Sequence, residues 1–169
     1  MHHRRPRLLF MPAGALLCTA LPWPLLTLAQ IVADANAPAA LLPLVTKAAN
    51  GVPVVHIQTP TAAGVSRNVY QQFDVQAHGA ILNNAAQAAA TQLGGWVQAN
   101  PLLQQPAAII VNEVNATRPS ALQGPIEVAG QRAQVIIANP SGIHCDGCGF
   151  INAHRATLTT GCLLYTSPS

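Results

Sequence analysis

Residues 107–114 read AAIIVNEV, and residues 133–138 read AQVIIA. Both stretches are short and rich in β-branched residues, and neither alternates strictly between apolar and polar positions. A strand that is covered on both faces has this pattern, because neither row of its side chains meets water. The two stretches therefore predict buried strands of a parallel sheet, which favours a solenoid over a sandwich.

Similar short apolar runs recur along the rest of the chain, separated by Gly, Asn and Pro. This spacing is typical of many short strands and indicates an all-β domain. Asparagines beside the runs also favour a solenoid, because Asn accepts left-handed backbone geometry and suits turns between coils. No strict repeat is visible. The runs are Val52–Ile57, Val69–Val75, Ala80–Leu82, Ile126–Val128, Phe150–Ile151 and Ala156–Leu158. The asparagines are Asn83, Asn84, Asn112, Asn115, Asn139 and Asn152.

Two segments depart from the strand pattern. Residues 31–49 are rich in Ala, Pro and Leu without a clear period, so we expect an extended lead-in. Residues 83–93 (NNAAQAAATQL) favour a helix by propensity, and Gly94-Gly95 follows them. They present no wide apolar face, so we expect a loop or a short helix outside the sheets.

Composition excludes several classes of protein. Only 8% of the 169 residues are charged and 50% are hydrophobic, which argues against disorder of the whole chain. Beyond residue 29 the basic and acidic residues balance, so the body lacks the positive patch of a nucleic-acid-binding protein. The basic residues there are Lys47, Arg67, Arg118, Arg132 and Arg155, and the acidic ones are Asp34, Asp74, Glu113, Glu127 and Asp146.

Residues 1–29 have the layout of a secretory signal peptide. Arg4, Arg5 and Arg7 precede an uncharged apolar run over residues 8–28. A charged start, an apolar middle and a small residue at the cleavage point define such signals. We expect cleavage after Ala29, with the Ala33-Asp34-Ala35 triplet as a second choice, and export. An uncleaved membrane anchor is the alternative, although three prolines interrupt the run.

Ordered motifs through the body resemble the N-terminal secretion domain of filamentous haemagglutinins, which also begins the large contact-dependent growth-inhibition toxins. The resemblance covers residues 30–161. The stretches that carry it are residues 50–57 (NGVPVVHI), 64–75 (GVSRNVYQQFDV), 81–84 (ILNN), 91–95 (TQLGG), 109–114 (IIVNEV), 127–133 (EVAGQRA), 137–143 (IANPSGI), 145–152 (CDGCGFIN) and 155–161 (RATLTTG).

The resemblance implies two-partner secretion. The expected fold is a right-handed parallel β-helix with an N-terminal cap, truncated here to its N-terminal portion. The Sec machinery would deliver the chain to the periplasm, where an outer-membrane transporter of the Omp85 type recognises it. The product would be secreted or held at the cell surface. An adhesin or toxin passenger would then meet the host or target cell. The resemblance implies no nucleic-acid partner, cofactor, metal or catalytic residue.

Two family turns are matched with one substitution each. The Asn-Pro-Asn-Leu turn corresponds to Asn100-Pro101-Leu102-Leu103, and the Asn-Pro-Asn-Gly-Ile turn corresponds to Asn139-Pro140-Ser141-Gly142-Ile143. Asn at the first position and Pro at the second favour a type I turn, and Gly accepts a positive φ. The turns therefore either shape corners of the β-helix or contact the transporter directly.

Cys145 and Cys148 form a Cys-Asp-Gly-Cys motif. Because the protein is expected to be exported, a disulfide is the first interpretation. Zinc bound with His144 or His154, a redox-active pair and free thiols are the alternatives.

Enzymatic chemistry is not indicated by the sequence. The acids of the body are scattered, and the histidines lack a recognisable nucleophile or acid beside them, so we expect no enzyme. A surface carbohydrate-binding β-helix module is the alternative function. Residues 162–169 (CLLYTSPS) resemble neither a further coil nor a natural terminus and are interpreted as a non-native, adapter-derived tail.

Overall fold

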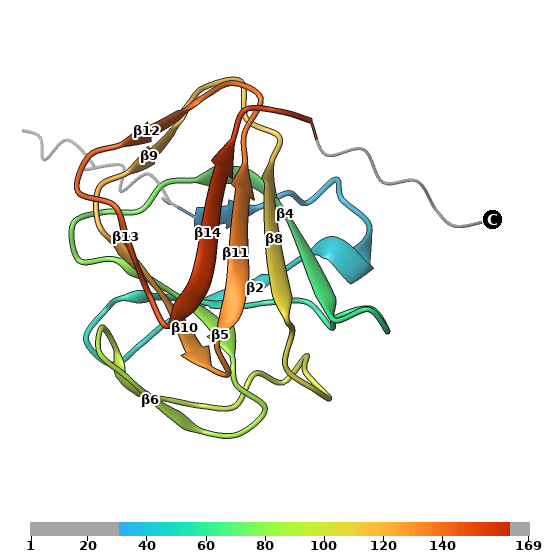
Figure 1. The fold of residues 1–169 in the computed structure, drawn as a ribbon, viewed down its shortest axis with the longest axis vertical. Coiled ribbons are helices and arrows are strands. Elements are labelled where there is room, and N and C mark those ends of the chain that lie inside the picture. The colour runs from blue at the N-terminus through green and yellow to red at the C-terminus, as the bar shows by residue number, and fades with distance from the viewer. Residues whose placement is uncertain (1–30, 163–169) are drawn as a thin grey trace, which may run out of the picture.

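The described part of the protein, residues 31–162 of a computed structural model, is a chain of short β-strands wound into a coil (Figure 1). A single 3₁₀ turn, Ala39–Leu41, interrupts the strands. None of the helices in this part of the chain is long and apolar enough to cross a membrane. The strands are β1 (Ile31–Ala33), β2 (Leu44–Lys47), β3 (Pro53–His56), β4 (Val65–Phe73), β5 (Ala80–Asn84), β6 (Ala89–Thr91), β7 (Gly95–Val97), β8 (Ile109–Val114), β9 (Ser120–Leu122), β10 (Pro125–Gly130), β11 (Ala133–Ala138), β12 (Ile143–Cys145), β13 (Gly149–Ile151) and β14 (Ala153–Thr159).

Three sheets form the sides of the coil. Sheet A has the order β1-β4-β8-β11-β14, sheet B the order β13-β10-β5-β3-β2, and sheet C joins β9 to β12. The chain passes from sheet A to sheet C to sheet B and back, as in β8-β9-β10 followed by β11-β12-β13. An isolated parallel bridge from Val75 to Leu122 extends sheet C to the coil of β4 and β5. The expected all-β, parallel β-helix is therefore confirmed.

Parallel register stacks side chains of the same kind inside the coil. Val135 pairs with Ile110 on one side and with Ala156 on the other, and both Val135 and Ile110 are fully buried. Each buried Val or Ile side chain contributes about 1.5–3 kcal/mol through removal from water. The predicted buried strands at residues 109–114 and 133–138 thus form the middle of sheet A.

The N-terminal end of the coil is closed by antiparallel strands. β1 pairs with β4, and β2 pairs with β3. Tyr70 and Phe73 fill the interior beneath this cap, with ring centroids 4.9 Å apart in an edge-to-face arrangement. Residues 31–49, expected to form an extended lead-in, are extended in two parts, β1 and β2, with a 3₁₀ turn between them. Backbone pairing with β4 and β3 gives this segment its strands, and that pairing leaves no periodic signal in the sequence.

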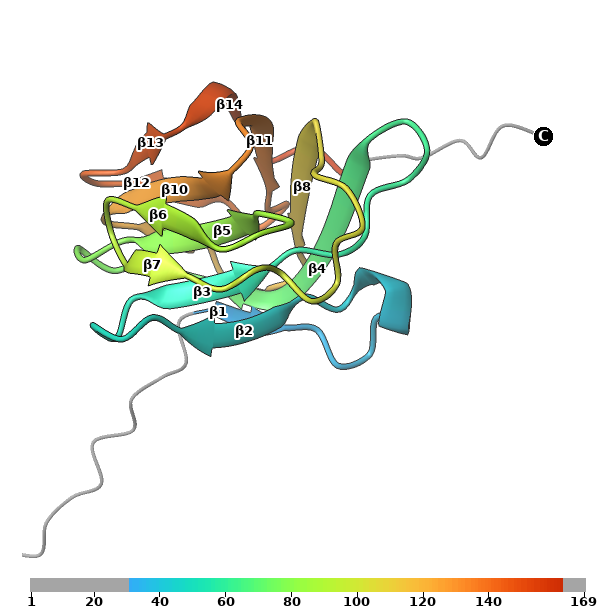
Figure 2. The ribbon, with the colours of Figure 1, turned by 90° about the horizontal axis from the view of Figure 1, so that it is seen from below.

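The hairpin β6–β7 lies outside the coil, against the outer face of sheet B (Figure 2). The prediction of a loop or short helix over residues 83–93 was wrong, and only the part beyond β5 lies outside the coil as expected. Asn83 and Asn84 complete β5, and the Ala-rich remainder pairs with β7. A second apolar cluster beneath the hairpin overrides helix propensity. It consists of Val52, Val54, Ile81, Val97 and Ala129.

A buried carboxylate anchors the hairpin to the coil. Glu127, on β10, accepts the backbone N–H groups of Gln92 and Leu93 at 2.8 Å each. The two bonds use both carboxylate oxygens, and the Glu127 side chain is thereby satisfied despite its burial.

We predict that Glu127→Ala loosens the hairpin, because it leaves two N–H groups without acceptors. The free energy of unfolding should fall by about 1–3 kcal/mol. Denaturant unfolding of the variant beside Asp146→Ala, an exposed acid on another loop, measures the effect. Equal stability of the two variants would contradict this assignment.

His56 links the cap to the coil. Thr46 Oγ1 of β2 lies 3.0 Å from Nε2, and Asn83 Nδ2 of β5 donates to Nδ1 at 3.2 Å. Burial lowers the pKa of His56 below its ordinary value of 6.5. Burial therefore favours the neutral ring, in which Nδ1 accepts the hydrogen bond from Asn83.

Because the pKa of His56 is lower in the folded than in the unfolded state, the neutral ring contributes its full stability above pH 6.5. That contribution is lost as the pH falls below 6.5 towards the folded-state pKa. We predict that His56→Gln flattens the acid side of a stability–pH curve measured by thermal unfolding. His78→Gln, at an exposed site, should leave the curve unchanged; an identical effect of both variants would rule out the role of His56.

Candidate functional site

The turn at residues 139–143 is closed by its first residue. Asn139 Oδ1 accepts the Ser141 N–H, and its backbone oxygen accepts the Gly142 N–H, each at 2.9 Å. Gly142 has a φ of +117°, a conformation that side chains with a Cβ rarely adopt. Asn139 therefore caps the turn, as the sequence predicts.

The same asparagine ties this turn to the preceding coil. Its Nδ2 donates to the Arg118 carbonyl at 3.2 Å and to Ser120 Oγ at 3.0 Å, and the whole residue is buried. Ser141, which stands where the family has Asn, donates from its hydroxyl to the Ala116 carbonyl at 2.7 Å. The amide of Asn139 is thus fully used inside the protein.

The turn at residues 100–103 has the same construction. Asn100 Oδ1 accepts the Leu102 N–H at 2.9 Å, and its backbone oxygen accepts the Leu103 N–H at 3.2 Å. Its Nδ2 donates to the carbonyls of Ile57 and Asn83 at 2.9 and 2.8 Å. The missing second Asn of the family motif leaves this geometry intact, because Leu102 contributes only its backbone N–H to closing the turn.

The structure does not bring the two turns together. Asn100 precedes β8, at the corner where the chain enters sheet A, and Asn139 follows β11, at the corner where it leaves that sheet. A six-residue strand such as β8 spans about 20 Å at roughly 3.3 Å per residue. The turns therefore occupy opposite ends of sheet A.

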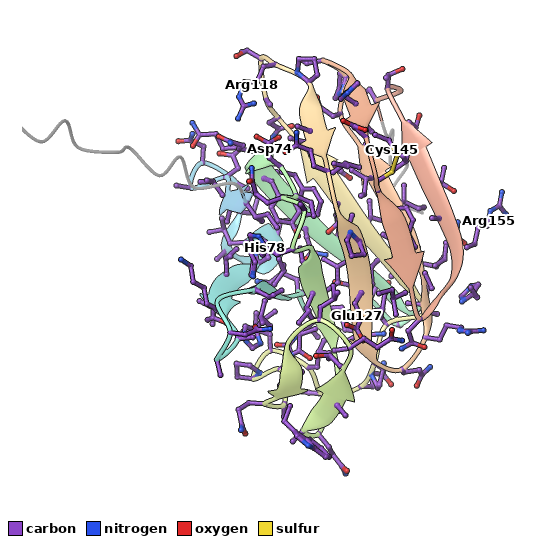
Figure 3. All side chains as sticks on the ribbon, turned by 90° about the vertical axis from the view of Figure 1, so that its left-hand side faces the viewer. Asp74, His78, Arg118, Glu127, Cys145 and Arg155 are labelled. Atoms are coloured by element: carbon purple, nitrogen blue, oxygen red, sulfur yellow. A yellow bond between two sulfur atoms is a disulfide. The ribbon has the colours of Figure 1, made fainter. Side chains whose placement is uncertain are left out.

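A buried acid and a half-exposed base lie beside the second turn. Asp74 Oδ2 accepts Arg118 Nη2 at 2.7 Å and Gln72 Nε2 at 2.8 Å, and Asp74 Oδ1 accepts the Ala121 N–H at 2.9 Å. Figure 3 shows Asp74 and Arg118 together on one side of the molecule, with Arg155 on the opposite side. Sequence reasoning missed this pair; the only signal for it is an acid directly after an apolar strand in a chain with few charges.

The Cys-Asp-Gly-Cys motif forms the loop between β12 and β13. Cys145 and Cys148 are joined in a disulfide, with their Cα atoms 5.3 Å apart. Residues 31–162 contain no group of three or more His, Cys, Asp or Glu side chains placed to hold a metal ion. The redox state of the pair in the exported protein stays a prediction.

Comparison with known proteins matches residues 29–165 to the family model of the TPS secretion domain, where TPS denotes two-partner secretion. "Toxin CdiA" of Yersinia pestis is 58% identical over 134 residues, which are 79% of this chain and 4% of that protein. "tRNA nuclease CdiA-2" of Burkholderia pseudomallei is 46% identical over 151 residues, 88% of this chain and 5% of that protein. The chain thus spans only 4–5% of the length of these two relatives.

A solved structure of a filamentous hemagglutinin secretion domain has the same fold. It matches with a TM-score of 0.73 and 39% sequence identity, over 80% of this chain and 44% of that domain's chain.

We predict that Asn139→Ala lowers the free energy of unfolding by about 1–3 kcal/mol, because it leaves buried backbone groups without their partners. Denaturant unfolding measures the loss. Ser141→Asn, which restores the family motif at an incompletely buried position, should be tolerated. Equal stability of Asn139→Ala and the wild type would contradict an architectural role for the turn.

Proposed function

The chain belongs to the TPS secretion domain family, whose members are recognised by a transporter partner, and we propose that residues 30–161 are the part of a large exoprotein that an Omp85-type outer-membrane transporter recognises in the periplasm. The domain is the secretion domain of an exoprotein of the CdiA and filamentous haemagglutinin type. The observation that carries the proposal is the match of the whole β-helical body to this family.

Export to the periplasm would depend on residues 1–29. We assign them as a Sec signal peptide; they lie outside the described residues, as do residues 163–169 of the segment interpreted as a non-native tail. Passage through the periplasm is also the condition under which the Cys145–Cys148 disulfide would form. The short ring that it closes includes only Asp146 and Gly147 between the cysteines.

Recognition, rather than catalysis, is the role that the described side chains support. Asp74 and Glu113 accept arginine guanidinium groups, and Glu127 accepts backbone N–H groups. These acids are engaged in holding the fold. The nuclease and toxin names of the relatives describe proteins about 20 to 25 times as long as the shared segment, so adhesin or toxin activity would reside in a passenger.

The two asparagine turns are proposed to serve recognition indirectly. Asn100 and Asn139 are both buried, and their side-chain amides donate hydrogen bonds to neighbouring coils. Pro101 and Pro140 are the exposed residues of the turns. The asparagines would fix the shape of each corner, and the transporter would contact the exposed surface around them.

Co-expression with the cognate transporter tests the proposed function. We expect the chain in the culture medium when the transporter is present, and in the periplasm when its periplasmic recognition modules are deleted. Retention beside a transporter that secretes its other substrates would contradict the proposal. A glycan array with the purified chain tests the carbohydrate-binding alternative, which specific binding to one glycan class would support.

A further inference from the structure

The corner that holds the second turn presents a ridge made of two successive coils. Pro140 is exposed above, and Arg118 and Pro119 are exposed in the coil below. A Cβ placed on Gly142 would lie 3.3 Å from Pro119 Cγ, so the two loops are packed directly against each other. We call Arg118, Pro119 and Pro140 the corner ridge.

Arg118 is fixed in place and yet accessible. Its guanidinium donates through Nη2 to Asp74, whose other oxygen is held by the Ala121 N–H. The Arg118 side chain is 51% exposed, whereas that of Asp74 is 11% exposed. A guanidinium has five N–H donors, and within residues 31–162 only the Nη2 contact to Asp74 is made. Arg118 therefore has donors left for a partner.

The other cations of the described chain lack this combination. Arg67 donates through Nε and Nη2 to both oxygens of Glu113, so its fork is already occupied. Lys47, Arg132 and Arg155 form no ion pair within residues 31–162, so no carboxylate there holds their long side chains. Ordering such a side chain on binding costs about 0.5–1.5 kcal/mol, a cost that Asp74 has already removed for Arg118.

We propose that the corner ridge is a docking surface for the transporter's periplasmic recognition module, with Arg118 as the contact residue and Asp74 as its positioning residue. This inference rests on the proposed function. A guanidinium fork matches a carboxylate, and Arg is enriched among residues that dominate protein interfaces. The partner surface would present an Asp or Glu to Arg118 and apolar side chains to the two proline rings.

Binding of the leaderless chain to the purified recognition module tests the proposal. We expect Arg118→Gln to raise the dissociation constant about tenfold or more, because the variant loses one charged hydrogen-bonded contact. Arg118→Lys should recover part of the affinity, because it keeps the charge without the fork. Asp74→Asn should fall between wild type and Arg118→Gln, since Arg118 remains but is no longer held.

Two arginine variants serve as matched controls. Arg155→Gln removes an exposed charge on the opposite side of the molecule. Arg67→Gln breaks the other ion pair between neighbouring coils. Both variants should bind with an affinity within about twofold of wild type, as expected for residues outside an interface. Added salt should weaken wild-type binding more than that of Arg118→Gln.

The outcomes separate the two proposals. Failure of the wild-type chain to bind the module contradicts the proposed function itself. Wild-type affinity of a protease-resistant Arg118→Gln overturns the docking surface and leaves that function standing. If Arg118→Gln is not protease-resistant, Arg118→Lys decides, because it keeps a cation beside Asp74: undiminished affinity then overturns the proposal.

Discussion

Buried asparagine amides at the corners of the coil are the interaction on which this β-helix depends. A chain that turns three times per coil leaves backbone groups at every corner outside the sheet ladders, and buried groups of this kind must be paired. Asn84, Asn100 and Asn139 each join neighbouring coils through Nδ2 bonds and lie within the protein. Within residues 31–162, no buried side-chain nitrogen or oxygen is left without a partner. Apolar stacking fills the coil, and the amides determine where it turns.

The sequence predicts those parts of the fold that repeat from coil to coil. Residues 109–114 and 133–138 are recognisable because the inner face of each strand is fully buried and the outer face is partly buried, so the apolar content is visible locally. The cap and the hairpin are not recognisable in this way. β2 owes its structure to pairing with β3, and the Ala-rich β6 is a strand because Glu127 and a small apolar cluster hold it there. Such contacts join distant residues and have no period in the sequence.

Part of the candidate site can likewise be predicted from the sequence, and part of it cannot. Both asparagine turns follow from local chemistry, since Asn and Pro at fixed positions close a turn whatever surrounds them. The Asp74–Arg118 pair joins residues 44 apart in sequence. It exists because the Val75–Leu122 bridge sets neighbouring coils side by side. A charge pair that depends on coil register can be found only once that register is known.

The division between buried and exposed residues also explains how the family motif can vary while the fold is kept. At each turn the first residue closes the loop and binds the neighbouring coil, and the third residue contributes a backbone N–H that any amino acid other than proline supplies. Leu102 and Ser141 therefore replace Asn without loss of the turn. The asparagines of the two turns determine the geometry of the corners. In the proposed docking surface a transporter would meet the outer side of the corner, where Pro140 is exposed. Under this proposal, selectivity among transporters would come from residues such as Arg118, which lies outside the turn motif and which the buried Asp74 holds through an ion pair.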